Sequence, residues 1–120
     1  MAIDSDLVFL DGSADITASK TDAAGLDFGG PDLVPVTYMV VVEGTSGTSP
    51  TLDIKIQESD NNSTWRDHLV FAQITTKGVF YATGKSDARY RRYYTTTGGE
   101  DPTFEKVLVA PVQAGRYDNF

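Results

Sequence analysis

The sequence predicts an all-β fold, an antiparallel β-sandwich of jelly-roll type, from three observations. The 120 residues contain several short segments rich in β-branched and aromatic residues, each bounded by Gly, Pro, Asn or Asp. One segment, residues 52–57, alternates strictly between apolar and polar side chains. No long window places apolar residues at the spacing of an amphipathic helix. Short strands separated by turns are typical of a sandwich, a jelly roll or a small barrel.

Two short strands are expected in the first twenty residues, followed by a loop. Residues 7–10 form an apolar run, and residues 15–19 follow a turn that contains Gly12 and Ser13. Residues 19–33 contain three glycines and a proline, and so predict a long loop. Loops of this length are usually functional or irregular.

The two strongest strand signals come next in the chain. Residues 34–42 are β-branched and almost continuously apolar, as in a strand inside a sandwich, and residues 51–58 alternate, as in a strand with one buried face. Turn-forming residues fill positions 43–50, so the two strands are expected to pair as a hairpin. The alternation predicts that Leu52, Ile54 and Ile56 face the core and that Asp53, Lys55 and Gln57 face the solvent.

Four further strands are expected at residues 65–74, 78–83, 89–96 and 104–110. The chain contains no internal repeat and no linker, and its length suits one hydrophobic core. We therefore expect a single domain over residues 1–120, with residues 1–11 and 113–120 as candidate arms that become ordered on a neighbouring molecule.

The formal net charge of −7 is unevenly distributed. Residues 1–60 carry eleven carboxylates and two lysines, whereas residues 61–120 carry eight basic and six acidic side chains. An acidic chain is poorly suited to sequence-independent binding of nucleic acid, which relies on many basic contacts to phosphate. A protein partner is the expectation, with the basic second half able to dock on an acidic surface.

The N-terminus and the composition bear on location. The first residues are acidic where a secretory signal peptide is basic, and no apolar run approaches the length of a membrane span. We therefore expect no membrane segment and no export. The chain has no cysteine, which excludes disulfides, thiolate metal sites and thiol nucleophiles.

The residues that could support catalysis or metal binding are few. His68 is the single histidine, and its expected place is on a strand without a chemical role. Residues 60–64 resemble the start of a calcium loop but lack its glycine and its bidentate glutamate, so a tight turn is expected. The glycine-rich stretches lack the lysine and the following helix of a phosphate loop. We expect no enzymatic activity, no cofactor and no metal.

The basic strip, residues 89–94, is the most informative stretch for function. Arg and Tyr are enriched at protein interfaces, because each offers a large contact area together with hydrogen bonds. The alternative is that the tyrosines pack and that the arginines pair with the acidic half of the same chain. The candidate interface residues are Arg89, Arg91, Arg92 and Tyr93, together with Tyr117 and Phe120 near the C-terminus.

The order of these segments carries a family resemblance. An apolar strand is followed by a Gly/Ser/Pro turn, then by residues 49–65, Arg89 and Tyr90, and residues 94–104. This order resembles the capsid cement, or head decoration, proteins of tailed bacteriophages. The resemblance implies a small, non-enzymatic protein that is made in the bacterial host cytoplasm and lies outside the capsid. It would tie neighbouring copies of the major capsid protein together, often as a dimer or trimer.

A second resemblance supports a different function. Residues 56–65 look like the strand, turn and tryptophan of the hairpin in discoidin-type carbohydrate-binding modules. Those modules are usually longer and secreted, which this chain is not expected to be. The alternative function that this hairpin implies is a carbohydrate-binding module, which a virion could also carry.

Overall fold

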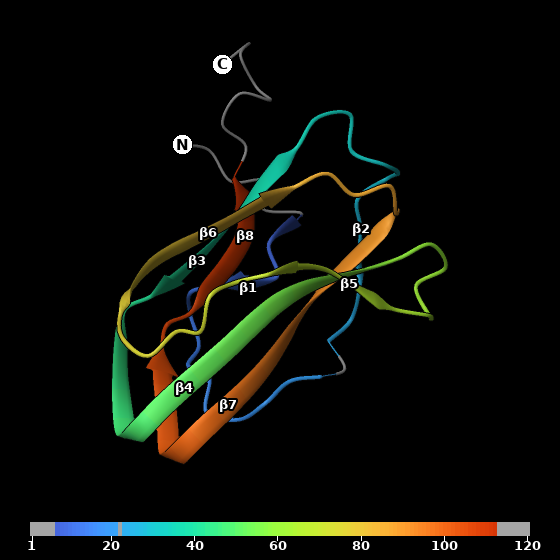
Figure 1. Ribbon diagram of the computed structural model, residues 1–120. Helices are drawn as coiled ribbons and strands as arrows, with labels where there is room; N and C mark the ends of the chain where they lie inside the picture. The colour runs from blue at the N-terminus through green and yellow to red at the C-terminus, as the bar shows by residue number, and fades with distance from the viewer. Residues whose placement is uncertain (1–6, 22, 113–120) are drawn as a thin grey trace.

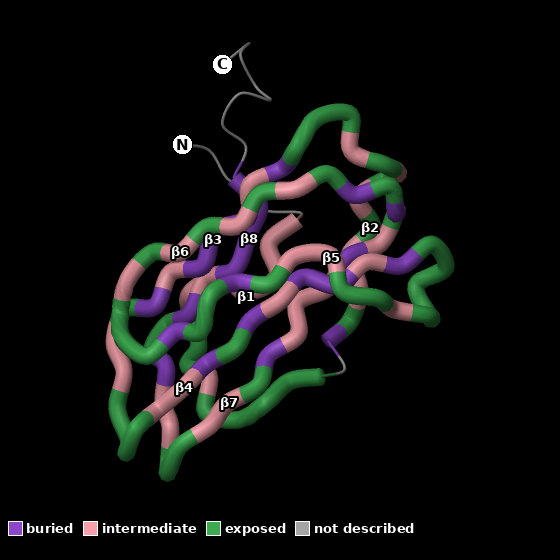
Figure 2. Tube along the Cα trace, in the orientation of Figure 1, coloured by how far each residue is buried: buried purple, intermediate pink, exposed green. Residues whose placement is uncertain are grey.

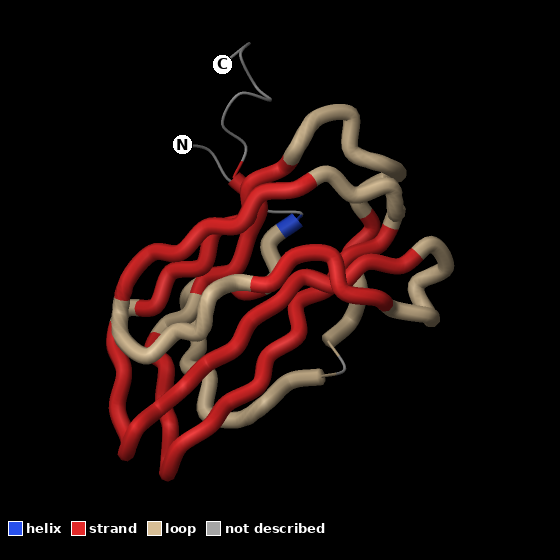
Figure 3. The backbone as a smooth tube through the Cα atoms, viewed as in Figure 1, coloured by secondary structure: helices blue, strands red, loops and turns tan. Residues whose placement is uncertain are grey.

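The computed structural model describes residues 7–21 and 23–112, and it consists of two antiparallel sheets packed face to face (Figure 1; Figure 3). The first sheet has the strand order β1-β8-β3-β6 and the second has the order β2-β7-β4-β5. The predicted all-β sandwich is confirmed. The strands are β1 (Leu10–Asp11), β2 (Leu26–Asp27), β3 (Val36–Val42), β4 (Gly44–Ser59), β5 (Arg66–Val70), β6 (Gly78–Gly84), β7 (Tyr90–Glu105) and β8 (Leu108–Val112).

The hairpin predicted from residues 34–58 is wrong, because β3 and β4 lie in different sheets. β3 pairs with β6 and β8, whereas β4 pairs with β5 and β7. The chain passes from one sheet to the other at Glu43, whose N–H donates to the carbonyl of Glu105. The two apolar strands therefore face each other across the core and share no ladder, and most of the expected turn, residues 44–50, is the first part of β4.

Several strand boundaries also differ from those expected. Residues 15–19 form no strand, and Ile16 makes only an isolated bridge to Phe104. The segment expected to be a loop, residues 19–33, is mostly irregular over its described residues, as predicted, but it also contributes β2 and a bridge from Lys20 to Thr95 on β7. The last strand begins at residue 108, because Lys106 adopts a left-handed turn conformation with a φ of 48°.

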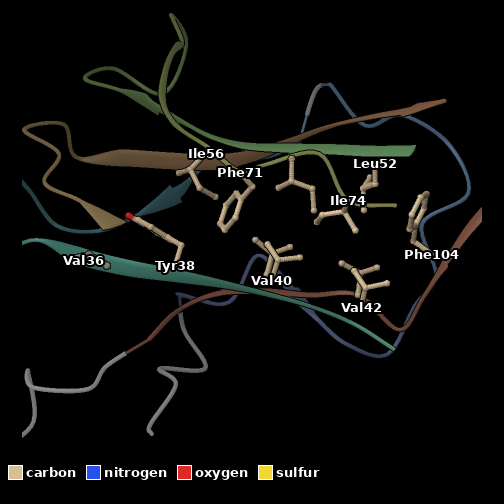
Figure 4. Close-up of a cluster of buried hydrophobic side chains, with 12 residues drawn as sticks. Val36, Tyr38, Val40, Val42, Leu52, Ile56, Phe71, Ile74 and Phe104 are labelled. Atoms are coloured by element: carbon tan, nitrogen blue, oxygen red, sulfur yellow. The ribbon is translucent and has the colours of Figure 1, made fainter. Parts of the chain in front are cut away.

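The core lies between the two sheets, and Figure 4 shows its side chains pointing toward one another from both layers. The predicted core residues Leu52, Ile54 and Ile56 are confirmed, with at most 1% of their surface exposed. On the opposite face Asp53 is exposed as predicted, but Gln57 is buried. The side-chain amide of Gln57 donates a hydrogen bond to Asp67 on β5 and accepts one from Arg92 on β7, and these two side chains cover it.

The two longest strands, β4 and β7, bend together at one end of the sandwich (Figure 1). At the bend, Gly47 and Gly99 have φ values of 106° and 93°. A Cβ on Gly47 would lie 2.5 Å from the carbonyl oxygen of Asp101, and a Cβ on Gly99 would lie 2.5 Å from that of Ser49. Each strand therefore needs its glycine because the backbone of the other comes so close.

Candidate interaction surfaces

The basic strip covers Arg89 and the first residues of β7, but its three arginines occupy three different environments. The most important difference concerns Arg91, which the sequence placed among the candidate interface residues. Its side chain is completely buried and forms a 2.7 Å ion pair with Asp32. It also donates hydrogen bonds to the hydroxyl of Tyr38 and to the carbonyl of Ala88, and its guanidinium lies 4.4 Å from the ring centroid of Phe28. Arg91 is therefore an internal residue, and its assignment to a docking surface is corrected.

A network of polar groups, most of them partly buried, surrounds Arg91. Asp32 accepts a 2.9 Å hydrogen bond from the N–H of Ser86, and the hydroxyl of Ser86 donates to Glu58 at 2.6 Å. Glu58 also receives a hydrogen bond from Arg66 and faces His68, whose Nδ1 lies 3.4 Å away. The network fixes the loop before β3 and the loop after β6 onto the second sheet.

The protonation of this network follows from its geometry. Burial alone would raise the pKa of Glu58, but hydrogen bonds from Ser86 and Arg66 lower it below the ordinary value. Burial lowers the pKa of His68, which favours the neutral imidazole. Burial raises the pKa of the Tyr38 hydroxyl to about 12.

The other two arginines of the strip lie at the surface, but both have partners in the same chain. Arg89 forms two 2.8 Å hydrogen bonds with Asp27, which lower the pKa of that carboxyl to about 2. Arg92 donates to the side-chain oxygen of Gln57 and lies 4.5 Å from the ring centroid of Trp65. The structure therefore supports the alternative in which the arginines pair within the chain.

Of the remaining candidate interface residues, the structure describes Tyr93 alone. Tyr93 is partly buried and packs against the core. Tyr117 and Phe120 lie outside the described residues, as do residues 1–6 and 113–116 of the expected arms. Within the first arm, the N–H of Phe9 donates to Val109 and β1 pairs with β8, so residues 9–11 belong to the sandwich.

The turn at residues 60–64 forms as expected. The Asn61 side-chain oxygen accepts hydrogen bonds from the N–H groups of Ser63 and Thr64, while Asn62 has a φ of 59°.

Over residues 7–21 and 23–112, no three His, Asp or Glu side chains are grouped in a way that could hold a metal ion. The same residues include no helix long and apolar enough to cross a membrane.

The outer face of the first sheet is apolar over β3, β6 and β8, which the sequence did not reveal, while the exposed Asp11 of β1 lies beside Leu108 at its edge. Val41 on β3 lies opposite Val79 on β6 and opposite Leu108 on β8. Two residues earlier on β3, Met39 lies opposite Tyr81 of β6. The strands β3, β6 and β8 contribute no charged side chain to this face. Val79 and Tyr81 have 50% and 53% of their surface exposed. We call Val41, Val79, Tyr81 and Leu108 the outer apolar patch.

The outer face of the second sheet differs in character. A shallow depression of about 310 Å³ lies beside Tyr94, between Asp53, Lys55 and Asp67. Lys55 spans it, because its Nζ lies 4.5 Å from the ring centroid of Tyr94 and 3.1 Å from Asp67. This face therefore combines an aromatic ring with charged and hydrogen-bonding groups.

Comparison with known proteins gives similarity to solved structures, without a match to a family model or to a curated protein. Among solved structures, the chain is similar to the Clostridium thermocellum endo-1,4-beta-D-xylanase 10B, described as its CBM22-1 and GH10 modules complexed with xylohexaose. The match has 12% sequence identity and a TM-score of 0.49, and it covers 92% of this chain but only 28% of the xylanase chain.

Proposed function

We propose that this chain is a non-enzymatic virion structural protein that binds the outside of a phage capsid and cements neighbouring major capsid subunits. The observation that carries the proposal is the outer apolar patch. A chain with a net charge of −7 presents two half-exposed apolar side chains, Val79 and Tyr81, on a sheet face to which three strands add no charge. Exposed apolar patches of this kind mark surfaces that bind other proteins.

The shape and rigidity of the sandwich support this role. The Cα atoms span 43 × 34 × 21 Å, so the molecule is a slab that has broad faces. The backbones of β4 and β7 lie close together at Gly47 and Gly99 in the bend, and the buried ion pair of Arg91 with Asp32 ties the loop before β3 to β7. A rigid slab with an apolar face can bury surface across a joint between two subunits, and many copies on one shell add their contacts.

Co-sedimentation of the purified chain with capsids assembled without it tests the proposal. We expect the wild-type chain to pellet with these capsids and to saturate at a fixed number of copies per shell. The variant Val41→Lys places a charge in the outer apolar patch and should weaken binding at least tenfold. The matched control is Val70→Lys, which places the same charge on the opposite sheet, where Val70 is 67% exposed, and it should bind normally. A wild-type chain that stays in the supernatant would refute the proposal.

The depression beside Tyr94 favours a second candidate, a carbohydrate-binding module. Sugar sites usually combine an aromatic ring with hydrogen-bonding side chains, and both are present there. Against this candidate, the Lys55 ammonium already covers one face of the Tyr94 ring. Titration of soluble oligosaccharides, followed by tryptophan fluorescence of wild type and Tyr94→Ala, distinguishes the two functions. Saturable binding that Tyr94→Ala abolishes would support the carbohydrate module.

A further inference from the structure

The two sheets have four terminal strands, and three of them carry features that prevent pairing with another chain. β1 and β2 are two residues long. β5 has two charged residues, Arg66 and Asp67, and its pairing with β4 is interrupted by a register shift at Ile56 and Gln57. Very short edges, charged side chains and bulges are the usual means by which proteins block edge-to-edge association.

The fourth terminal strand, β6, has none of these protective features. It is seven residues long, about 24 Å, and pairs in register with β3 from Gly78 to Gly84 with no shift. It contains no charged residue and no proline. Within residues 7–21 and 23–112, β3 is the strand that pairs with it, so its other edge presents backbone N–H and C=O groups along its length (Figure 1). Figure 2 shows exposed positions alternating along the strand.

We propose that β6 is the site of homodimerisation, in which it pairs antiparallel with β6 of a second copy across a two-fold axis. The two four-stranded sheets β1-β8-β3-β6 would then form one continuous eight-stranded sheet. A second copy is the favoured occupant because an antiparallel edge is complementary to itself: a two-fold axis brings each donor opposite an acceptor. The absence of charge on β6 also avoids repulsion between two chains that each carry a net charge of −7.

The side chains favour one register of this pairing, with the axis at Phe80. Val79 then lies opposite the second copy's Tyr81, and Tyr81 opposite the second copy's Val79, which gives two aromatic–β-branched pairs on the outer face. This register also keeps Lys77 of one copy away from Lys85 of the other, whereas an axis at Tyr81 would place these lysines opposite each other.

The resemblance implies a dimer or trimer without naming a surface; the pairing of β6 in the Phe80 register goes beyond it, and its test needs no capsid. Sedimentation equilibrium of the purified wild-type chain at about 100 μM should give twice the 13.0 kDa mass of one chain. The double variant V79K/Y81K places like charges opposite each other across the axis and should be monomeric. Its matched control, L33K/V70K, adds the same charge at two exposed apolar residues away from β6 and should stay dimeric. A monomeric wild-type chain, or a V79K/Y81K variant that folds and stays dimeric, would overturn the proposal.

Cysteine cross-linking provides a second readout that does not depend on the lysine variants. The chain has no cysteine, so introduced thiols have no internal competitor. Under mild oxidation, Val79→Cys chains mixed with Tyr81→Cys chains should form a disulfide-linked dimer, while each variant alone should cross-link at least tenfold less. Efficient cross-linking of Tyr81→Cys alone would refute the Phe80 register, and no cross-linking in the mixture would refute pairing through β6.

Discussion

Arg91 on β7 and Asp32 in the loop before β3 form a 2.7 Å ion pair that is almost entirely removed from solvent. The arginine side chain has no exposed surface, and the aspartate side chain has 8%. Because the loop has no regular secondary structure at this point, the pair and its hydrogen bonds to Ser86 and Tyr38 determine where the loop lies.

The first prediction concerns this pair. Replacing Arg91 with Met leaves Asp32 buried without its cation, which should lower the free energy of unfolding by about 3–5 kcal/mol. The double variant R91M/D32N removes both charges and should be less destabilised than the sum of its single variants. The control is Arg89→Met, whose pair with Asp27 is exposed and screened by solvent, so its loss should destabilise the fold far less than the loss of Arg91. Urea denaturation measures the stability of Arg91→Met, Asp32→Asn, the double variant and Arg89→Met. Equal losses of stability for Arg91→Met and Arg89→Met would contradict the buried role of Arg91.

The second prediction concerns the register of β4. Ile54 is 1% exposed in the core, so Ile54→Asp buries an unpaired carboxylate and should abolish cooperative folding. Ile54→Ala, which only removes packing, should cost about 2–5 kcal/mol. Asp53→Asn at the adjacent exposed position should change stability by no more than about 0.5 kcal/mol. Thermal unfolding followed by circular dichroism tests the series, and a tolerated Ile54→Asp would show that the register is wrong.

The third prediction separates the backbone strain of a positive φ from the steric clash between strands, by comparing Gly29, which lies away from the bend of β4 and β7, with Gly99, which lies in it. Gly29 and Gly99 both have positive φ, 86° and 93°, but a Cβ on Gly29 would meet nothing within 4 Å, whereas one on Gly99 would meet the Ser49 carbonyl. Gly29→Ala should therefore show only the backbone strain, about 1–2 kcal/mol. Gly99→Ala adds a clash with backbone and should cost about 3 kcal/mol or more. Similar unfolding midpoints in urea for the two variants would argue against the close approach of the strands.

The fourth prediction concerns pH. His68 is partly buried beside Glu58, near Arg91 and Asp32, and this partial burial holds its pKa below the ordinary value of 6.5. The unfolded chain then binds a proton more readily than the folded chain, so stability is fully present above pH 6.5 and is lost as the pH falls through the pKa of the folded state. Nuclear magnetic resonance of this single histidine should report a pKa below 6.5, and His68→Gln should flatten the stability profile just below that pH. A pKa at or above 6.5 would contradict the account.

The features that the sequence predicted correctly are local ones. The positions of Leu52, Ile54 and Ile56 follow from alternation along one strand, because a slip by one residue would bury Asp53 or Lys55. The turn at residues 60–64 follows from the preferences of its own residues. Both predictions need no knowledge of how distant segments meet.

The features that the sequence did not predict depend on topology. Gly, Ser and Pro at positions 43–50 suit a hairpin and a passage between two sheets equally well, so composition did not place β3 and β4 in different sheets. Arg91 looked like an interface residue because its partner, Asp32, lies far away in the sequence. The uncharged stretch of β6 was visible in the sequence, but only the strand order makes it an edge.

Electron cryomicroscopy of intact particles is the most direct test of the central claim that the chain cements a capsid. We expect density for the sandwich on the outer surface of the shell, with the outer apolar patch against a joint between two major capsid subunits. That density should be missing from particles assembled without the chain and should return when purified chain is added. Particles whose outer surface is the same with and without the chain would contradict the claim.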